Sequence, residues 1–355
     1  MKNQEKIFVI GHKNPDTDSI CSAIAYCDIK NRTTQESRYI PKRAGQINEE
    51  TEYVLNRFGV HPPGYLSNIG TQVKDMDIRL SPEANKSMSL KNAWDLMQEN
   101  SIVSLPIREK DGTLEGLITI GDIAKTYMDT TDSYLLSRAR TQYQRIAETI
   151  GGKVIEGNAH GYFIQGKIMV ATANPDKMKE YVEENDMVIM GNREEDHLQA
   201  IEQNVSCIIV GMGIEVTEKV LKLAHEKDIV IISSPYDTFT ISRLINQSIP
   251  VKYIMKTDNL VTFNTEDFTD DIQEVMIKHR HRAFPVINKK GKCIGTISRR
   301  NFLDMHRKKV VLVDHNEKDQ AVDNIDKADI MESIDHHKLG TLQTMQPISF
   351  RNQPV

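Results

Sequence analysis

The chain has 355 residues, of which 39% are hydrophobic and 27% charged, and its formal net charge is −5. This composition predicts a soluble globular protein of two or three domains, and its mild acidity gives no reason to expect a nucleic-acid partner. The sequence contains no apolar run of membrane-spanning length, and its polar start differs from a signal peptide. The four cysteines form no CxxC pair, so we expect a cytoplasmic protein with reduced thiols.

The first segment, residues 1–68, begins with an apolar run at residues 7–10 that predicts a strand. The loop after this strand reads GHKNPDTD and holds His12, Asp16 and Asp18. A buried helix is expected to follow, capped by Asp18 or by the serine after it. Because ligands of parallel sheets gather at the carboxyl ends of the strands, this loop is a candidate metal-binding loop.

Residues 70–128 and 250–306 are interpreted as two copies of one module. The landmarks of the first copy are a Leu-Pro strand, two glycines and a hydroxyl residue, and each has a counterpart 179 residues later, where the strand reads Phe-Pro. Each copy is expected to fold as strand, helix, strand, turn, strand and helix. The hydroxyl residue precedes a carboxylate or an amide by three positions, which gives the pairs Thr119 with Asp122 and Ser298 with Asn301.

The block between the copies, residues 135–248, alternates apolar runs with helical stretches. This alternation predicts a small α/β domain with a largely parallel sheet. The expected strands are residues 167–171, 187–190, 207–210 and 229–233, and the expected helices include 176–184 and 216–226. The block has no catalytic constellation, so we interpret it as a scaffold or a dimer-forming domain.

The last segment, residues 307–355, returns to the pattern of the first. One apolar run leads to Asp314 in the motif VDHNE, and a second leads to the motif DHH at residues 335–337. The simplest architecture is one parallel α/β domain split by a long insertion. Three strand ends that carry carboxylates and imidazoles would then meet in one metal site.

Within such a site, His12 and Asp16 could reach one ion, Asp18 a second, and Asp314 both. The two histidines of the DHH motif are adjacent, so we expect their side chains to diverge, one toward metal and the other toward substrate. A site rich in carboxylates with a few imidazoles favours Mn²⁺. Taken singly, however, each histidine could be structural and each aspartate a helix cap.

The motifs GHxNPDTDS, VDHNE and DHH resemble the signatures of the DHH phosphoesterase superfamily and, within it, of family II manganese-dependent inorganic pyrophosphatases. The repeated module resembles a CBS domain and the middle block a DRTGG domain, in the order of the CBS-domain-containing pyrophosphatases. The resemblance covers essentially the whole chain. It implies an α/β fold in which a parallel-sheet DHH domain is split by an insertion of two CBS domains flanking a small α/β DRTGG-like domain.

The resemblance also implies the chemistry. Pyrophosphate would be hydrolysed to two phosphates without a covalent enzyme intermediate, with Mn²⁺ or Co²⁺ as cofactor and Mg²⁺ accompanying the substrate. In the catalytic site, His337 would contact the substrate phosphate and Asp335 would support the site from behind. The implied metal ligands are His12, Asp16, Asp18, Asp314 and His336.

The chain departs from the family pattern at two places. Family members continue well beyond the position of Val355, with a further bridging aspartate and a second domain that bears Lys and Arg. We therefore expect a C-terminally truncated fragment with weak metal binding and little or no turnover. The middle block lacks a literal DRTGG string, and residues 191–195 read GNREE at a comparable place.

The paired modules resemble adenine-nucleotide sites and imply regulation by such nucleotides, in a homodimer or larger homo-oligomer. The alternative is that the two hydroxyl-containing pairs only cap helices. Asn301 stands where the first module has the carboxylate of Asp122, and this weakens the nucleotide site expected in the second module. The resemblance implies phosphate contacts for Thr119 and Ser298, ribose contacts for Asp122 and Asn301, and adenine near Val103 and Arg282.

Two other functions share these motifs. A DHH-type phosphodiesterase acting on nucleotides or short oligonucleotides would use the same metal ligands, although the acidic net charge and the PDTDS and VDHNE details disfavour it. A nucleotide-sensing module without catalytic activity would need only the paired modules. Assays with pyrophosphate and with oligonucleotides, beside nucleotide-binding calorimetry, separate the three.

Overall fold

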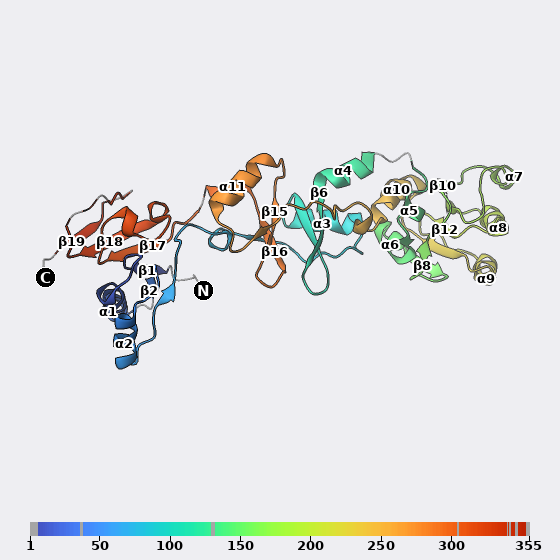
Figure 1. Cartoon of the computed structure of the whole chain (residues 1–355). Helices are drawn as coiled ribbons and strands as arrows, with labels where there is room; N and C mark the ends of the chain where they lie inside the picture. Colours follow the sequence, from blue (N-terminus) through green and yellow to red (C-terminus); the bar gives the residue numbers. More distant parts are fainter. Residues whose placement is uncertain are drawn as a thin grey trace. The chain divides into compact units, whose positions relative to one another are not determined.

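The computed structural model describes residues 6–35, 38–128, 132–303, 305–338, 340, 342–344 and 347–352. The chain forms two compact units, each described by itself (Figure 1). Unit 1 comprises Met1–Ile78, Phe263–His281 and Ile297–Val355. Unit 2 comprises Arg79–Thr262 and Arg282–Thr296. Among the described residues, no helix is both long and apolar enough to cross a membrane.

Unit 1 is built on a six-stranded parallel sheet in the order β19-β18-β17-β1-β2-β3 (Figure 1). Ile10 of β1 pairs with Leu312 of β17, and Val313 of β17 pairs with Ile334 of β18. Because of this register, the loops that follow β1, β17 and β18 begin at the same edge of the sheet. The strands are β1 (Ile7–Ile10), β2 (Tyr39–Arg43), β3 (Gly64–Tyr65), β17 (Lys309–Val313), β18 (Asp329–Asp335) and β19 (Ser349–Asn352).

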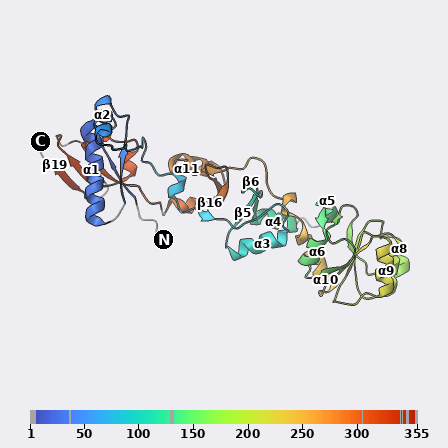
Figure 2. The same cartoon turned by 90° about the horizontal axis from the view of Figure 1, so that it is seen from below.

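Helix α1 (Thr17–Thr34) covers one face of this sheet, and α2 (Glu49–Arg57) packs beside α1 (Figures 1 and 2). Ala23 and Cys27 of α1 contact the odd-numbered strand residues Val9 and Val311, whereas Ile10 and Leu312 face a second core cluster. Alternate strand residues therefore fill two cores, as expected for a sheet buried on both faces.

The helix cap expected at Asp18 or Ser19 is wrong. Asp16 is the N-cap of α1, and its side chain accepts a hydrogen bond from the Ser19 backbone N–H at 3.0 Å. A carboxylate at the N-cap satisfies an otherwise unpaired backbone N–H group. Asp18 lies in the first turn, where it accepts a hydrogen bond from Ser22.

Unit 1 also contains part of the second repeated module, namely β14 (Phe263–Asn264), α11 (Thr269–Lys278) and the 3-10 helix η4 (Arg299–Phe302). The final helix expected for this copy is wrong, because the chain makes only this short 3-10 turn. It has to reach the start of β17 at Lys309 soon afterwards. The first copy, which lies in unit 2 from Arg79 onward, does end in an α-helix.

That first copy follows the predicted order of elements. Helix α3 (Leu90–Glu99) begins at Ser89, whose side chain caps the Asn92 N–H, and it buries Leu90, Ala93 and Met97 on one face. This spacing is the signature of an amphipathic helix. The other elements are β4 (Arg79–Leu80), β5 (Ser104–Arg108), β6 (Leu114–Thr119) and α4 (Ile120–Met128), and β4 pairs with β16 (Cys293–Ile297), which follows β15 (Phe284–Ile287).

The middle block of unit 2 has a sheet in the order β10-β11-β12-β13-β8, in which the first four strands are parallel and β8 is antiparallel. Helices α8 and α9 pack on one face, and α6 and α10 on the other (Figure 2), while Met178 of α7 joins the core cluster on the side of α8 and α9. The predicted small α/β domain is thus confirmed. Its elements are α5 (Leu135–Arg138), β7 (Thr141–Gln142), α6 (Tyr143–Thr149), β8 (Lys153–Glu156), β9 (Tyr162–Phe163), β10 (Ile168–Val170), α7 (Pro175–Met178), β11 (Met187–Met190), α8 (Glu194–Glu202), β12 (Cys207–Val210), α9 (Glu218–Glu226), β13 (Val230–Ser233) and α10 (Thr238–Leu244).

The helix expected over residues 176–184 is wrong beyond Met178. The buried Asp186 accepts hydrogen bonds from the backbone N–H groups of Glu183 and Lys167, at 2.9 Å each. This side chain competes with helix hydrogen bonding for the Glu183 N–H group. The chain therefore turns toward β11 after a single helical turn.

Candidate metal centre

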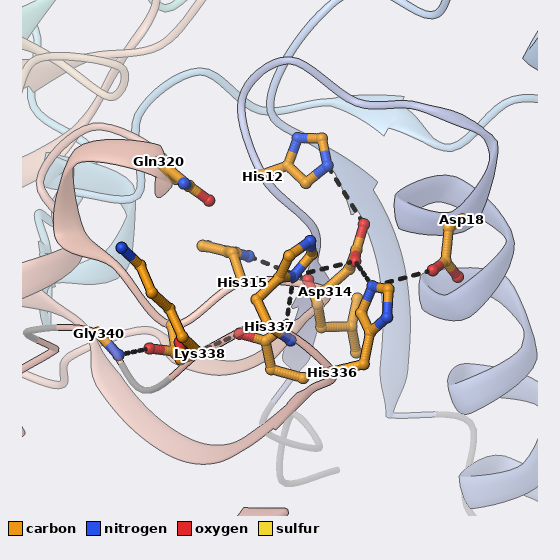
Figure 3. Close-up of polar contacts among 12 residues, drawn as sticks. His12, Asp18, Asp314, His315, Gln320, His336, His337, Lys338 and Gly340 are labelled. Carbon is orange, nitrogen blue, oxygen red and sulfur yellow. Dashed lines mark hydrogen bonds and ion pairs between the residues drawn. The ribbon is translucent and has the colours of Figure 1, made fainter. Parts of the chain in front are cut away.

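The loops after β1, β17 and β18 bring the sequence-predicted metal residues together (Figure 3). Nε2 of His12 lies 3.2 Å from Oδ2 of Asp314 and 3.8 Å from Oδ1 of Asp16. Nε2 of His336 lies 3.1 Å from Oδ1 of Asp314 and 3.5 Å from Oδ2 of Asp18. All five predicted ligands therefore converge around Asp314, although they come from opposite ends of the sequence.

Asp314 occupies the centre of this cluster in an unusual backbone conformation. Its φ is +61°, in the left-handed region that aspartate and asparagine tolerate better than other side chains with a Cβ. Its N–H donates to Ile334 of β18 at 2.9 Å, so the turn is fixed to the sheet. The side chain is only 4% exposed, and a buried carboxylate is costly unless cations or donors surround it.

The donor set fits a divalent transition-metal ion. Among the described residues, Oδ2 of Asp314 is buried and has no hydrogen-bond partner, although the His12 nitrogen lies close to it. The part of the chain that the structure describes contains two groups of possible metal ligands, and within each group the ligand atoms all lie within 4.8 Å of one another. Asp314 belongs to both groups. Carboxylate oxygens mixed with imidazole nitrogens suit Mn²⁺ or Co²⁺. The groups are His12, Asp16 and Asp314, and Asp314, Asp335, His336 and His337.

The electrostatics of the cluster favour positive charge. The Asp314 carboxylate raises the pKa of His12, against the lowering effect of burial. Asp335 likewise raises the pKa of His337. Burial lowers the pKa of His315, whose Nδ1 lies 3.0 Å from the Val313 carbonyl oxygen. A cation entering the cluster would therefore displace a proton held by His12.

The expected divergence of His336 and His337 is wrong. Their ring centroids are 4.3 Å apart, and Nδ1 of His337 also approaches Oδ1 of Asp314, at 3.8 Å. The reason is the turn after β18, where Oδ1 of Asp335 accepts hydrogen bonds from both the N–H (3.0 Å) and Nδ1 (2.7 Å) of His337. This local pairing folds the second imidazole back toward the carboxylates.

Close backbone packing holds the loop after β1 in place. A Cβ at Gly45 would lie 2.0 Å from the Lys13 carbonyl oxygen and 2.6 Å from Cδ of Pro15. The Lys13 N–H also donates to the Gln320 carbonyl at 2.8 Å. The loop that carries His12 and Asp16 thus depends on a position without a side chain.

We expect Gly45→Ala to destabilise the protein by about 1–3 kcal/mol, because overpacking forces backbone shifts. The Mn²⁺ affinity should fall as well, since the loop moves. Thermal denaturation and calorimetry measure both effects. Gly191→Ala is the matched control, because in the described part of the chain no heavy atom lies within 4 Å of its Cβ position. Equal melting temperatures for the two variants would contradict this account.

The predicted nucleotide residues form two separate capping pairs. The Thr119 N–H and hydroxyl donate to Asp122, and the Asp122 N–H donates back to the hydroxyl. Ser298 donates to Asn301 in the same way. The capping geometry expected by the alternative interpretation is therefore present in both pairs, and nucleotide binding stays a prediction.

The two pairs differ in what contacts their second member, which is Asp122 in the first pair and Asn301 in the second. Oδ1 of Asp122 lies 3.5 Å from Nζ of Lys256, whereas Nδ2 of Asn301 donates to the Asp77 carbonyl at 2.6 Å. Val103 accepts a hydrogen bond from the Ile120 N–H, next to the first pair, and Arg282 is exposed.

Comparisons with known proteins bear on both units. The CBS-domain family matches residues 78–129 and 251–308, and the DRTGG-domain family matches residues 145–248. The DRTGG assignment therefore holds without the literal string.

Relatives among the pyrophosphatases match over almost the whole chain. A cobalt-dependent inorganic pyrophosphatase of Clostridium perfringens is 38% identical over 99% of this chain, and a protein of Thermotoga maritima named "Probable manganese-dependent inorganic pyrophosphatase" is 32% identical over 100%. The chain spans 64% of the length of each relative.

Solved structures are similar to this chain as well, and one of them is at least 30% identical. It contains the CBS and DRTGG domains of the regulatory region of the C. perfringens pyrophosphatase, complexed with the activator diadenosine tetraphosphate. It is 34% identical, with a TM-score of 0.61, and the match covers 64% of this chain and 100% of that one. The CBS and DRTGG domains of this chain therefore belong to the same family as that regulatory region, and the chain is a homologue of pyrophosphatases described as cobalt- or manganese-dependent.

Proposed function

We propose that the protein carrying this chain is a metal-dependent inorganic pyrophosphatase of the DHH superfamily, and that adenine nucleotides bound to its CBS domains regulate it. The observation that carries the proposal is the position of Asp314 in both metal-capable groups. A carboxylate shared by two groups of ligands is the arrangement that a two-metal hydrolase needs. Homology to pyrophosphatases along the whole chain supports the choice of substrate.

The residues of the site would have different roles in the reaction. His12, Asp16, Asp18, Asp314 and His336 would hold the ions. Bound Mn²⁺ or Co²⁺ would activate water for attack on phosphorus and neutralise charge on the phosphoryl oxygens. His337 would contact the substrate phosphate, and the hydrogen bond that Asp335 accepts would keep its imidazole oriented. The raised pKa of His337 lets it act as a proton donor to phosphate oxygen over a wider pH range.

A cavity beside the carboxylates offers room for the substrate. It has a volume of about 440 Å³, and its lining includes Asp18, Asp314, His336, Tyr26 and Arg351. Arg351 provides a cation next to this cavity. Pyrophosphate is expected to enter with Mg²⁺, because the cluster itself is rich in carboxylates and repels a bare anion.

The assay that tests this function uses the product of the complete coding sequence. We expect Mn²⁺- or Co²⁺-dependent phosphate release from pyrophosphate, lost on chelation, and a decrease of about 100-fold or more in kcat for His337→Gln. Hydrolysis of short oligonucleotides but not of pyrophosphate would favour the phosphodiesterase alternative. Nucleotide binding without any hydrolysis would favour the nucleotide-sensing alternative.

Contacts within unit 1 support the proposed regulation. The segment that follows the first part of the sheet, residues 69–77, is bonded to the second CBS domain. Asn301 donates to Asp77, Thr269 donates to Thr71, and Lys308 donates to Gly70 and lies 3.1 Å from Asp75. A nucleotide that preferred one arrangement of this domain would bias the sheet to which the segment leads. We expect a homodimer or larger homo-oligomer as the regulated form.

We expect Asp122→Ala to weaken binding of diadenosine tetraphosphate about 10- to 100-fold, because hydrogen bonds to a charged group contribute about 1.5–3 kcal/mol. Isothermal titration calorimetry measures the affinity. Asp111→Ala is the control, since Asp111 is an exposed carboxylate in the turn of the same module, where it bonds Thr113. If both variants bound like the parent, Asp122 would only cap its helix.

A further inference from the structure

Asn316 is a buried amide that joins three parts of the metal centre, and the sequence alone assigned it no role. Only 4% of its surface is exposed. Its Nδ2 donates to Oδ2 of Asp335 and to the Lys338 carbonyl oxygen, and its Oδ1 accepts from the Gly340 N–H. Three of the four hydrogen bonds available to an amide are thus used within a single turn of chain.

These bonds fix the carboxylate of Asp335 from one side. The other oxygen, Oδ1, accepts from the N–H and from Nδ1 of His337. The two oxygens of Asp335 therefore have different partners, and the carboxylate cannot rotate without losing both. Since the side chain is buried, the lost bonds would not be replaced by water.

The turn after His337 packs directly against Asn316. A Cβ at Gly340 would lie 2.5 Å from Oδ1 of Asn316 and 2.4 Å from Cγ of Glu317. Only glycine permits this approach. The same amide therefore holds the carboxylate behind His337 and the chain that follows His337.

We propose that Asn316 is a positioning residue that acts through Asp335 to set the orientation of the His337 imidazole. In this orientation, the neutral imidazole of His337 carries its proton on Nδ1, which faces Asp335. Nε2 then faces away from the Asp335 carboxylate. Outer hydrogen-bond partners of this kind decide which nitrogen of a histidine is available to a metal or a substrate. The consequence for catalysis rests on the proposed function, whereas the orientation of the imidazole does not.

The test is nuclear magnetic resonance of the chain labelled with ¹⁵N-histidine, recorded without metal at about pH 9, where free imidazole is neutral. His337→Gln identifies the His337 signals, and Asp335→Asn supplies the reference for a His337 released from its carboxylate. We expect the parent to show the Nδ1–H form. In Asn316→Ala and Asn316→Leu, this form should no longer dominate.

Two further readings separate positioning from simple loss of structure. The Mn²⁺ affinity of both variants should change little, because the hydrogen bonds of Asn316 go to Asp335, Lys338 and Gly340 and to none of the five proposed metal ligands. The matched control is Asn68→Ala, because Asn68 bonds Gly70 and Asn324 in the same unit but contacts no imidazole. If Asn316→Leu does not fold, Asn316→Ala carries the test.

Parent-like His337 signals in a folded Asn316 variant would overturn the inference, whatever the substrate. Shifted signals together with no hydrolysis of pyrophosphate by the complete protein would leave the positioning role standing and reject the proposed function. In the active protein, Asn316→Ala should lower kcat more than it changes KM, because Asn316 does not itself touch the substrate.

Discussion

Replacing Asp314 with asparagine is expected to lower the Mn²⁺ affinity of the chain by about 100-fold or more, since it removes the one carboxylate common to both metal-capable groups. Its oxygens lie 3.2 Å from Nε2 of His12 and 3.1 Å from Nε2 of His336, so it links the two groups of ligands. Asparagine has nearly the same size and tolerates the positive φ of this position, so the fold should be kept. Calorimetry or electron paramagnetic resonance of added Mn²⁺ measures the change.

The matched control is Asp323→Asn. Asp323 lies in the same unit and 3.9 Å from Lys13, but its side chain is 68% exposed and belongs to neither ligand group. Its replacement should leave the Mn²⁺ affinity within about threefold of the parent, as for an exposed ion pair. An Asp314→Asn variant that also stayed within this range would mean that Asp314 does not hold the metal.

The second large effect is a steep rise of Mn²⁺ affinity with pH. Asp314 raises the pKa of His12 above its ordinary value of 6.5, and a metal ligand must give up this proton. Below the raised pKa, the affinity should fall about tenfold per pH unit for each proton released. Calorimetry in buffers of different ionisation enthalpy should detect proton release on Mn²⁺ binding, and this release should decrease as the pH rises through the pKa of His12.

The raised pKa of His12 also determines whether the stability of the protein rises or falls with pH. Without metal, a raised folded-state pKa makes protonated His12 stabilise the protein at low pH, and this contribution is lost as the pH rises through that pKa. With Mn²⁺, the trend should reverse, because binding strengthens as His12 loses its proton. A His12→Gln variant should lose most of the pH dependence of binding. An affinity that is flat between about pH 6 and 8 in the parent would contradict the assignment of His12.

The sequence was sufficient to predict where the candidate site lies. Apolar runs at residues 7–10, 310–313 and 330–334 correspond to strands β1, β17 and β18, and parallel pairing makes their carboxyl ends neighbours. The repeat predicted two modules around an α/β block, in agreement with the CBS and DRTGG matches. These features depend on local periodicity and on repetition, which are visible in one sequence.

What escaped prediction depends on contacts between side chains and backbone. The cap of α1 is Asp16 rather than Asp18 or Ser19, because its side chain is the one that accepts a hydrogen bond from a backbone N–H of the first turn. His336 and His337 point to the same side, because Asp335 bonds the second one. Asn316 lies within the VDHNE motif, but its role becomes apparent only from its hydrogen bonds with Asp335 and Gly340.

The most direct test of the central claim is X-ray diffraction from Mn²⁺-soaked crystals of the chain, recorded at the manganese absorption edge. We predict anomalous density enclosed by His12, Asp314 and His336, where three loops that are distant in the sequence converge. Anomalous density only elsewhere on the protein, or none at saturating Mn²⁺, would contradict a metal centre at these strand ends and with it the proposed hydrolase.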